Sequence, residues 1–175
     1  MGTGVDDLIV FGAKYVVYIM VAGFVVFWLL AVPRPDKLRA GLSAVLGLVI
    51  VLVFIKIAGS VHSDPRPFVQ DPSLKPLIDH AADNGFPSDH SAAAGLMAML
   101  VLLRHRLYGA LFWIGAAIVA ASRVGAHVHH AQDVIAGLLL GAAAAWLGVL
   151  VVTACFSLAA RRSSGKHREL EAQGS

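Results

Sequence analysis

The chain has 175 residues, of which 58% are hydrophobic and 14% charged, whereas an ordinary soluble domain has about 45–50% and about 25%. Its mean hydropathy is +0.74, so the composition excludes a disordered chain, a collagen and a coiled coil and predicts an integral membrane protein. The net charge is +3, but the basic residues stand in short clusters beside apolar runs, which indicates membrane orientation and no nucleic-acid partner. Cys155 is the single cysteine, which excludes a disulfide framework.

Five apolar runs predict an all-α bundle of about five transmembrane helices. They cover residues 15–32, 41–61, 91–103, 107–121 and 134–160, and a helix needs ~20 residues to cross ~30 Å of hydrocarbon. The third and fourth runs are short, but polar sequence beside them can extend each helix. The alternative interpretation, that these two runs are buried helices of a soluble protein, does not account for the three long runs. The first run follows an acidic start that does not match a signal peptide, so we expect it to be retained.

Basic residues follow the first, third and fifth runs and predict the side of the membrane that each loop occupies. They are Arg34, Lys37 and Arg39, then Arg104 and Arg106, then Arg161, Arg162, Lys166 and Arg168. With five crossings, all three clusters fall on the cytoplasmic side. We therefore expect residues 1–160 to form a membrane domain, residues 161–175 a cytoplasmic polar tail, and the loops 62–90 and 122–133 to lie outside.

The first cluster in the outer loops is Lys56 followed by Asp-Pro-Arg-Pro-Phe at 64–68. Prolines on both sides of Arg66 restrict the backbone, and the planar guanidinium suits phosphate oxygens. The alternatives are that Lys56 merely extends to the membrane interface and that Arg66 binds lipid headgroups nonspecifically. Beyond this cluster, residues 70–83 have apolar residues at helical spacing, which predicts a short amphipathic helix lying over the site.

The second cluster is Asn-Gly-Phe-Pro-Ser-Asp-His at 84–90, directly before the third apolar run. Ser88 has the character of a helix N-cap, which would place His90 in the first turn, beside backbone amides that form a ready anion site. The alternative is that these residues only start a helix and that His90 has no role.

The third cluster lies at 122–133, between the fourth and fifth runs. His129 and Asp133 are four residues apart, so on a helix the carboxylate can accept the imidazole N–H and leave the other ring nitrogen free as a base or nucleophile. A competing interpretation is a metal site built from His127, His129, His130 and Asp133. Such a site has no need of the surrounding lysine and arginines, so we expect no metal and no cofactor.

Together the clusters supply three cations, a helix N-terminus and two histidines, one of which has a carboxylate partner. Cations and amides would hold phosphate oxygens, one histidine would attack phosphorus, and the other would protonate the departing oxygen. The sequence therefore predicts phosphoryl transfer without a metal.

Three motifs resemble the signature of the type 2 phosphatidic acid phosphatase superfamily. They are Arg66-Pro67, Pro87-Ser88-Asp89-His90, and Ser122-Arg123 with His129 and Asp133. Within that superfamily, residues 64–69 and 84–90 most resemble the bacitracin-resistance type of undecaprenyl diphosphatase. The resemblance runs from about residue 56 to residue 137.

The resemblance implies that His129 is a nucleophile forming a phosphohistidine, that Asp133 orients it, and that His90 is the general acid that later activates water. It also implies a phosphate site, whose residues are Lys56, Arg66, Ser88, Arg123 and, through its backbone amide, Asp89. Two positions depart from the family pattern. Lys56 stands three positions farther from Arg66 than is usual, and Asp89 replaces the more common glycine.

The implied activity is hydrolysis of undecaprenyl diphosphate, a polyprenyl diphosphate lipid, to undecaprenyl phosphate and phosphate. It would take place at the extracytoplasmic face of the bacterial cytoplasmic (inner) membrane, with the lipid tail between helices. One alternative is a phosphatidylglycerophosphate or phosphatidic acid phosphatase, because the motifs bind phosphate rather than the tail. A noncatalytic lipid-diphosphate binder or transporter would use the same cations.

Overall fold

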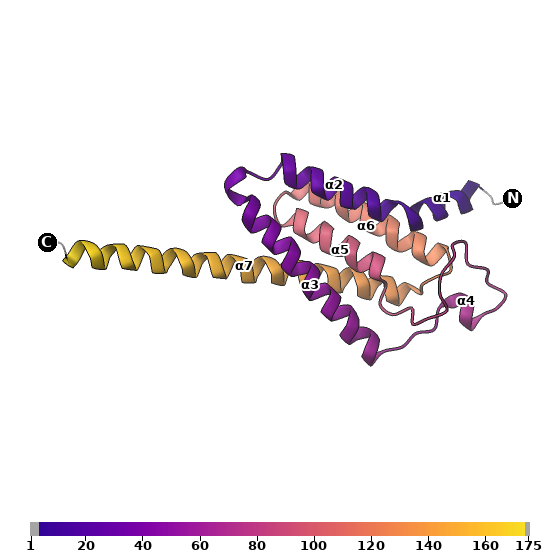
Figure 1. The fold of residues 1–175 in the computed structure, drawn as a ribbon. Helices are drawn as coiled ribbons and strands as arrows, with labels where there is room; N and C mark the ends of the chain where they lie inside the picture. The colour runs from indigo at the N-terminus through magenta and orange to yellow at the C-terminus, as the bar shows by residue number, and fades with distance from the viewer. Residues whose placement is uncertain (1–3, 174–175) are drawn as a thin grey trace.

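The computed structural model describes the backbone of residues 4–173 and the side chains of residues 4–161. Its elements are α1 (Gly4–Lys14), α2 (Val16–Leu30), the 3-10 helix η1 (Arg34–Asp36), α3 (Lys37–Val61), α4 (Pro67–Gln70), α5 (Asp89–Leu102), α6 (Arg106–Gly125) and α7 (Ala131–Gln173). Figure 1 shows a helical bundle with the loop that carries α4 at one end, while α7 projects far beyond the other end. The all-α prediction is confirmed for the described residues.

In the described part of the chain, three helices have the length and apolar composition of a membrane span, and a bent helix pair makes a fourth if it is counted as one span. They are residues 34–61, residues 106–125, residues 131–161, and the pair α1 and α2, which are bent by 45° at Tyr15. The remaining predicted span, the third run at residues 91–103, corresponds to α5, whose 14 residues extend only about 21 Å at 1.5 Å per residue. The helix α1 was not expected, because the acidic residues Asp6 and Asp7 obscured its apolar face.

The centre of the bundle is α5, which the other long helices enclose. Ala92, Ala94, Ala98 and Val101 of this helix have no exposed surface. Glycines of α7 allow close helix packing, because a Cβ atom at Gly141 would collide with the Ala92 carbonyl. A short, protein-enclosed α5 is therefore held against α7, which brings the residues before both helices together.

The prediction of an amphipathic helix at residues 70–83 is wrong. The loop contains only the one-turn helix α4, and residues 71–83 form turns and bends. Pro72 and Pro76 interrupt this segment, and proline cannot donate the amide hydrogen bond that a helix interior requires. The segment is instead fixed by the Leu77 amide, which donates to the Ala126 carbonyl at 3.1 Å, and by the buried side chain of Ile78.

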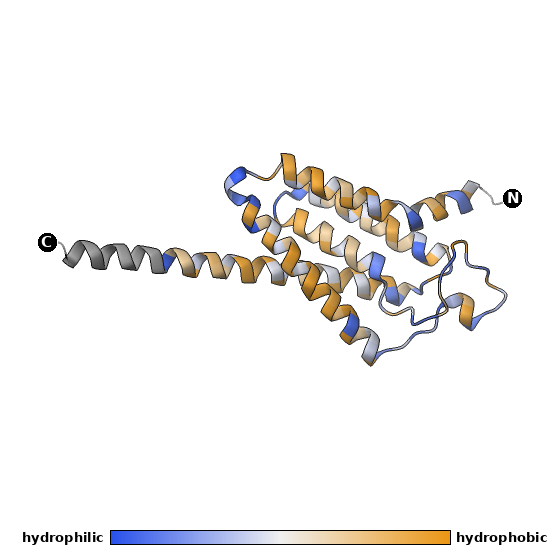
Figure 2. Ribbon diagram, in the orientation of Figure 1, coloured by the Kyte–Doolittle hydropathy of each residue, from blue (hydrophilic) through white to orange (hydrophobic). Residues whose placement is uncertain are grey.

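Figure 2 shows apolar helices between two more polar ends of the bundle. At the end away from α4, the connection from α2 to α3 meets the connection from α5 to α6, since Asp36 and Arg104 line a common cavity. Two of the predicted basic clusters thus lie at the same end. The backbone of α7 continues through the predicted tail to Gln173, but the side chains of Arg162, Lys166 and Arg168 lie outside the described residues.

Candidate active site

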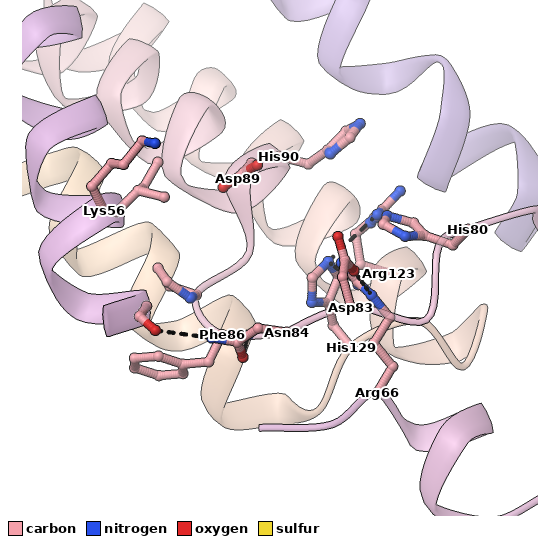
Figure 3. A pocket seen from close by; sticks show the side chains of 13 residues that line it. Lys56, Arg66, His80, Asp83, Asn84, Phe86, Asp89, His90, Arg123 and His129 are labelled. Atoms are coloured by element: carbon pink, nitrogen blue, oxygen red, sulfur yellow. Dashed lines mark hydrogen bonds and ion pairs between the residues drawn. The ribbon is translucent and has the colours of Figure 1, made fainter. Parts of the chain in front are cut away.

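A cavity of about 500 Å³ opens at the end of the bundle where α3 ends and α5 begins. It brings together most of the predicted site residues, namely Lys56, Arg66, Asp89, His90, Arg123 and His129. Figure 3 shows that Arg66, Arg123 and His129 gather on one side of the cavity, with Lys56 on the other side and Asp89 between them. The three motifs, far apart in the sequence, therefore share one cavity.

The two ring nitrogens of His129 have different surroundings. Nδ1 lies 2.9 Å from the Gly85 carbonyl and 3.4 Å from Asp133 Oδ2. Nε2 lies 3.3 Å from a guanidinium nitrogen of Arg66 and 3.4 Å from one of Arg123. Because a carbonyl only accepts hydrogen bonds, we assign the ring proton to Nδ1, which leaves the lone pair of Nε2 facing the cations.

This geometry modifies one prediction from the sequence. Asp133 does lie beside His129, but the Gly85 carbonyl is the nearer acceptor for its N–H group. A backbone acceptor in a distant loop leaves no signal in the sequence, so pattern analysis missed it.

Burial lowers the pKa of His129, and the positive charges of Arg123 and Arg66 lower it further. The hydrogen bond to Asp133 opposes these effects and raises it, but the net shift is downward. The imidazole is therefore neutral near pH 7, as a nitrogen nucleophile must be.

Asp133 connects the nucleophile to a second polar network. Its side chain is fully buried, and Oδ2 accepts a hydrogen bond from the His130 amide at 2.8 Å. Nδ1 of His130 lies 3.0 Å from Asp64 Oδ2, and the same oxygen accepts a hydrogen bond from the Gln132 side chain at 2.6 Å. Burial alone would raise the pKa of Asp64, but the Gln132 hydrogen bond and the His130 charge hold it below its ordinary value.

The structure does not assemble the alternative metal site. Among the described residues, the group with metal-ligand spacing is Asp64, His130 and Asp133, whose ligand atoms lie within 4.8 Å of one another. Nε2 of His129 faces the arginines instead of this group, and His127 is half-buried, with its Nδ1 atom 3.3 Å from the Lys75 carbonyl. The two histidines that flank His129 thus contact groups of the surrounding loops.

Arg66 is almost completely buried, with 4% of its surface exposed. One terminal nitrogen donates to the Val128 carbonyl at 2.8 Å, and Nε donates to Asp83 Oδ1 at 2.8 Å. The Arg66 hydrogen bond lowers the pKa of Asp83, which is therefore ionised. Arg123 is also buried, and in the described part of the chain its Nε has no hydrogen-bond partner. Two guanidinium groups are thus fixed beside Nε2 of His129.

The start of α5 agrees with the predicted helix cap. Ser88 is the N-cap residue, and its hydroxyl accepts from the Ser91 amide at 3.5 Å. His90 stands in the first turn and lines the cavity, as expected. Ser88 itself is fully buried and is not among the cavity-lining residues, so its geometry fits a cap better than a phosphate ligand.

Two titratable residues of the cavity lining escaped prediction, His80 and Asp83, both from the segment that follows α4. Neither belongs to a motif, and the predicted helix would have placed them differently. Asn84, next in the chain, accepts from the Asp64 amide and donates to the Gly59 carbonyl, which fixes this loop to the end of α3.

Residues 40–157 match the family model of the PAP2 superfamily. The chain is 37% identical over 136 residues to the bacitracin transport permease protein BcrC of Bacillus licheniformis, covering 78% of this chain and 66% of that protein. It is 31% identical over 137 residues to the undecaprenyl-diphosphatase BcrC of Bacillus subtilis, covering 77% and 68%. The aligned region thus spans about two thirds of the length of these relatives.

The fold is similar to the crystal structure of LpxE from Aquifex aeolicus, with a TM-score of 0.66 and 19% sequence identity. That likeness covers 85% of this chain and 87% of the other. The match to the family model and the identity to these relatives agree with the shared cavity of the three motifs. The chain therefore belongs to the PAP2 superfamily, the phosphatase superfamily that its motifs resemble, and it is a membrane-spanning member.

Proposed function

We propose that this protein hydrolyses undecaprenyl diphosphate to undecaprenyl phosphate and phosphate through a phosphohistidine on His129. The observation that carries the proposal is the orientation of His129, whose Nδ1 is held by an acceptor while Nε2 faces two buried arginines. The undecaprenyl-diphosphatase name of the Bacillus subtilis relative supports the choice of substrate.

The chemistry follows from these positions. The terminal phosphate replaces the contacts of Arg66 and Arg123 with Nε2, and the guanidinium groups stabilise the charge on its oxygens. The Nε2 lone pair forms a bond to phosphorus as the bond to the bridging oxygen breaks, and His90 gives a proton to that oxygen. Water then attacks phosphorus, the N–P bond breaks, and His90 takes the proton of the water. None of these steps draws on a metal or a cofactor.

We infer that the cavity faces the extracytoplasmic side of the cytoplasmic membrane. Two connections, from α2 to α3 and from α5 to α6, lie at the opposite end of the bundle (Figure 1), and both carry basic residues. Because an excess of lysine and arginine marks cytoplasmic loops, this distribution supports an outward-facing site.

A second cavity, of about 270 Å³, has an almost wholly apolar lining between α2, α3 and α5. Phe24, Leu48 and Ala93 contribute to it, and Ala93 is one helical turn from His90. An apolar groove of this kind suits a polyprenyl tail while the diphosphate occupies the polar cavity.

The Bacillus licheniformis relative is named a transport permease, which favours one alternative, a transporter that binds the lipid diphosphate without turnover. Phosphate release by the detergent-purified full chain separates the possibilities. We expect rapid release from undecaprenyl diphosphate, with excess chelator having no effect and with loss of activity in His129→Ala. Release from phosphatidylglycerophosphate alone would keep the mechanism and change the substrate, whereas binding without release would support a transporter.

A further inference from the structure

His80 lines the active-site cavity, although it belongs to none of the three motifs. Its ring lies 6.1 Å from the ring of His129, centroid to centroid, with an angle of 77° between the two planes. Figure 3 shows His80 on the side of the cavity that holds His129 and the two arginines. A phosphate that binds beside Nε2 of His129 therefore also lies near the imidazole of His80.

The loop holds His80 firmly on both sides along the chain. Two residues before it, Ile78 is 5% exposed and packs against Ala126 and Val128, which belong to the connection that carries His129. Three residues after it, Asp83 pairs with Arg66 at 2.8 Å. A side chain between two such anchors is preorganised, so little ordering is needed when a ligand binds.

One ring nitrogen of His80 has unused hydrogen-bonding capacity. The Nδ1 atom is buried and, within the described residues, has no hydrogen-bond partner. A buried polar atom without a partner is costly unless a ligand or water satisfies it. In a cavity that already contains two guanidinium groups, the ligand that fits this histidine is an anion.

We propose that His80 is a further substrate-contacting residue, whose imidazolium donates a hydrogen bond to the terminal phosphate beside His129. The proposal rests on the phosphatase function proposed above and adds a contact to the phosphate site of the three motifs.

The charges around His80 explain how it would respond to a phosphate. The charged and titratable groups near it are Arg66, Arg123, His90, His129 and, on its own loop, Asp83. Burial and the positive charges of Arg66 and Arg123 lower the pKa of His80, a hydrogen bond to the Ala81 backbone opposes them, and the net shift is downward, so the imidazole is neutral near pH 7 before an anion binds. A phosphate bound between the arginines offsets their charge and favours protonation of the imidazole. The contact therefore becomes charge-assisted when substrate is present.

The test compares the full-length enzyme with two variants, His80→Ala and His80→Gln. The measured quantities are kcat and KM for undecaprenyl diphosphate and the Ki of inorganic phosphate as a product inhibitor, from about pH 5.5 to about pH 8.5. We expect His80→Ala to raise KM and Ki about tenfold while kcat falls less than about threefold. The increase in Ki should be largest at low pH, and His80→Gln, which donates but cannot carry a charge, should lose this pH dependence.

His127→Asn is the matched control. It removes an imidazole that contacts the same loop through the Lys75 carbonyl but does not line the cavity, and asparagine tolerates the positive φ of 59° at this position. An unchanged Ki in His80→Ala, an equal increase in His127→Asn, or a Ki ratio that is constant with pH would overturn the proposal. If the wild-type chain releases no phosphate, the proposed function fails, and calorimetric binding of inorganic phosphate to the same variants tests the His80 contact independently.

Discussion

Nδ1 of His129 lies closer to the backbone carbonyl of Gly85, at 2.9 Å, than to the carboxylate of Asp133, at 3.4 Å. The carbonyl belongs to the loop before α5 and the carboxylate to the first turn of α7, so the ring is held between two elements. Because either acceptor can keep the proton on Nδ1, the tautomer that exposes Nε2 does not depend on the carboxylate alone.

Asp133→Asn should therefore reduce activity without abolishing it. The Gly85 carbonyl would still fix the tautomer, but the neutral amide would no longer stabilise positive charge on the ring. We expect kcat to fall about 100-fold, which corresponds to ~2.7 kcal/mol. Steady-state phosphate release measures this, with His129→Ala as the inactive reference. A loss as large as that of His129→Ala would mean that Asp133 by itself sets the tautomer.

The lowered pKa of His129 predicts the acid limb of the pH profile. The nucleophile must be neutral, and it is neutral above its own pKa, so the acid limb of kcat/KM should be centred below the ordinary histidine value of about 6.5. In Asp133→Asn the hydrogen bond that raises this pKa is lost, so the limb should move to lower pH. A wild-type limb centred above about pH 6.5 would contradict this assignment.

Arg66 should contribute mainly to the transition state. Arg66→Gln removes a buried charge next to Nε2 of His129, and the loss of one preorganised donor to a developing oxyanion costs about 10²- to 10³-fold in kcat. Arg104→Gln is the control, because this exposed arginine lines a cavity at the opposite end of the bundle. Its kcat should stay within about twofold of wild type. Similar losses in both variants would point to a general effect on folding.

The packing of α7 against α5 should be sensitive to small additions of volume. A Cβ atom at Gly141 would collide with backbone atoms of Ala92 and Leu96, so Gly141→Ala should destabilise the protein by about 1–3 kcal/mol. Gly41→Ala is the control, since its nearest neighbour is a Trp28 ring atom at 3.8 Å. Thermal unfolding in detergent compares the two, and equal midpoints would show that the helices can separate without cost.

The long apolar runs and the polar motifs were readable from the sequence because each has a local cause. Hydrocarbon thickness determines the helix lengths, and the N-cap at Ser88 and the i, i+4 pair of His129 and Asp133 depend only on neighbours in the chain. Where tertiary packing decides, the sequence was less informative. The enclosed α5 is shorter than a span, and the expected helix at residues 70–83 is replaced by turns around Pro72 and Pro76.

The same limit applies within the site. His80 and Asp83 enter the cavity only because their loop packs against the connection between α6 and α7, and no spacing in the chain records that contact. The acceptor role of Gly85 is carried by a main-chain atom, which every residue possesses.

The most direct test of the proposed mechanism is to trap the covalent intermediate. The full-length protein is mixed with undecaprenyl diphosphate labelled in its terminal phosphate, quenched in alkali, in which phosphohistidine persists, and analysed by peptide mass spectrometry. We expect labelled phosphate on Nε2 of His129 in the wild-type enzyme and none in His129→Ala. Turnover without a labelled protein, or a label on His90 instead, would contradict the assignment of His129 as the nucleophile.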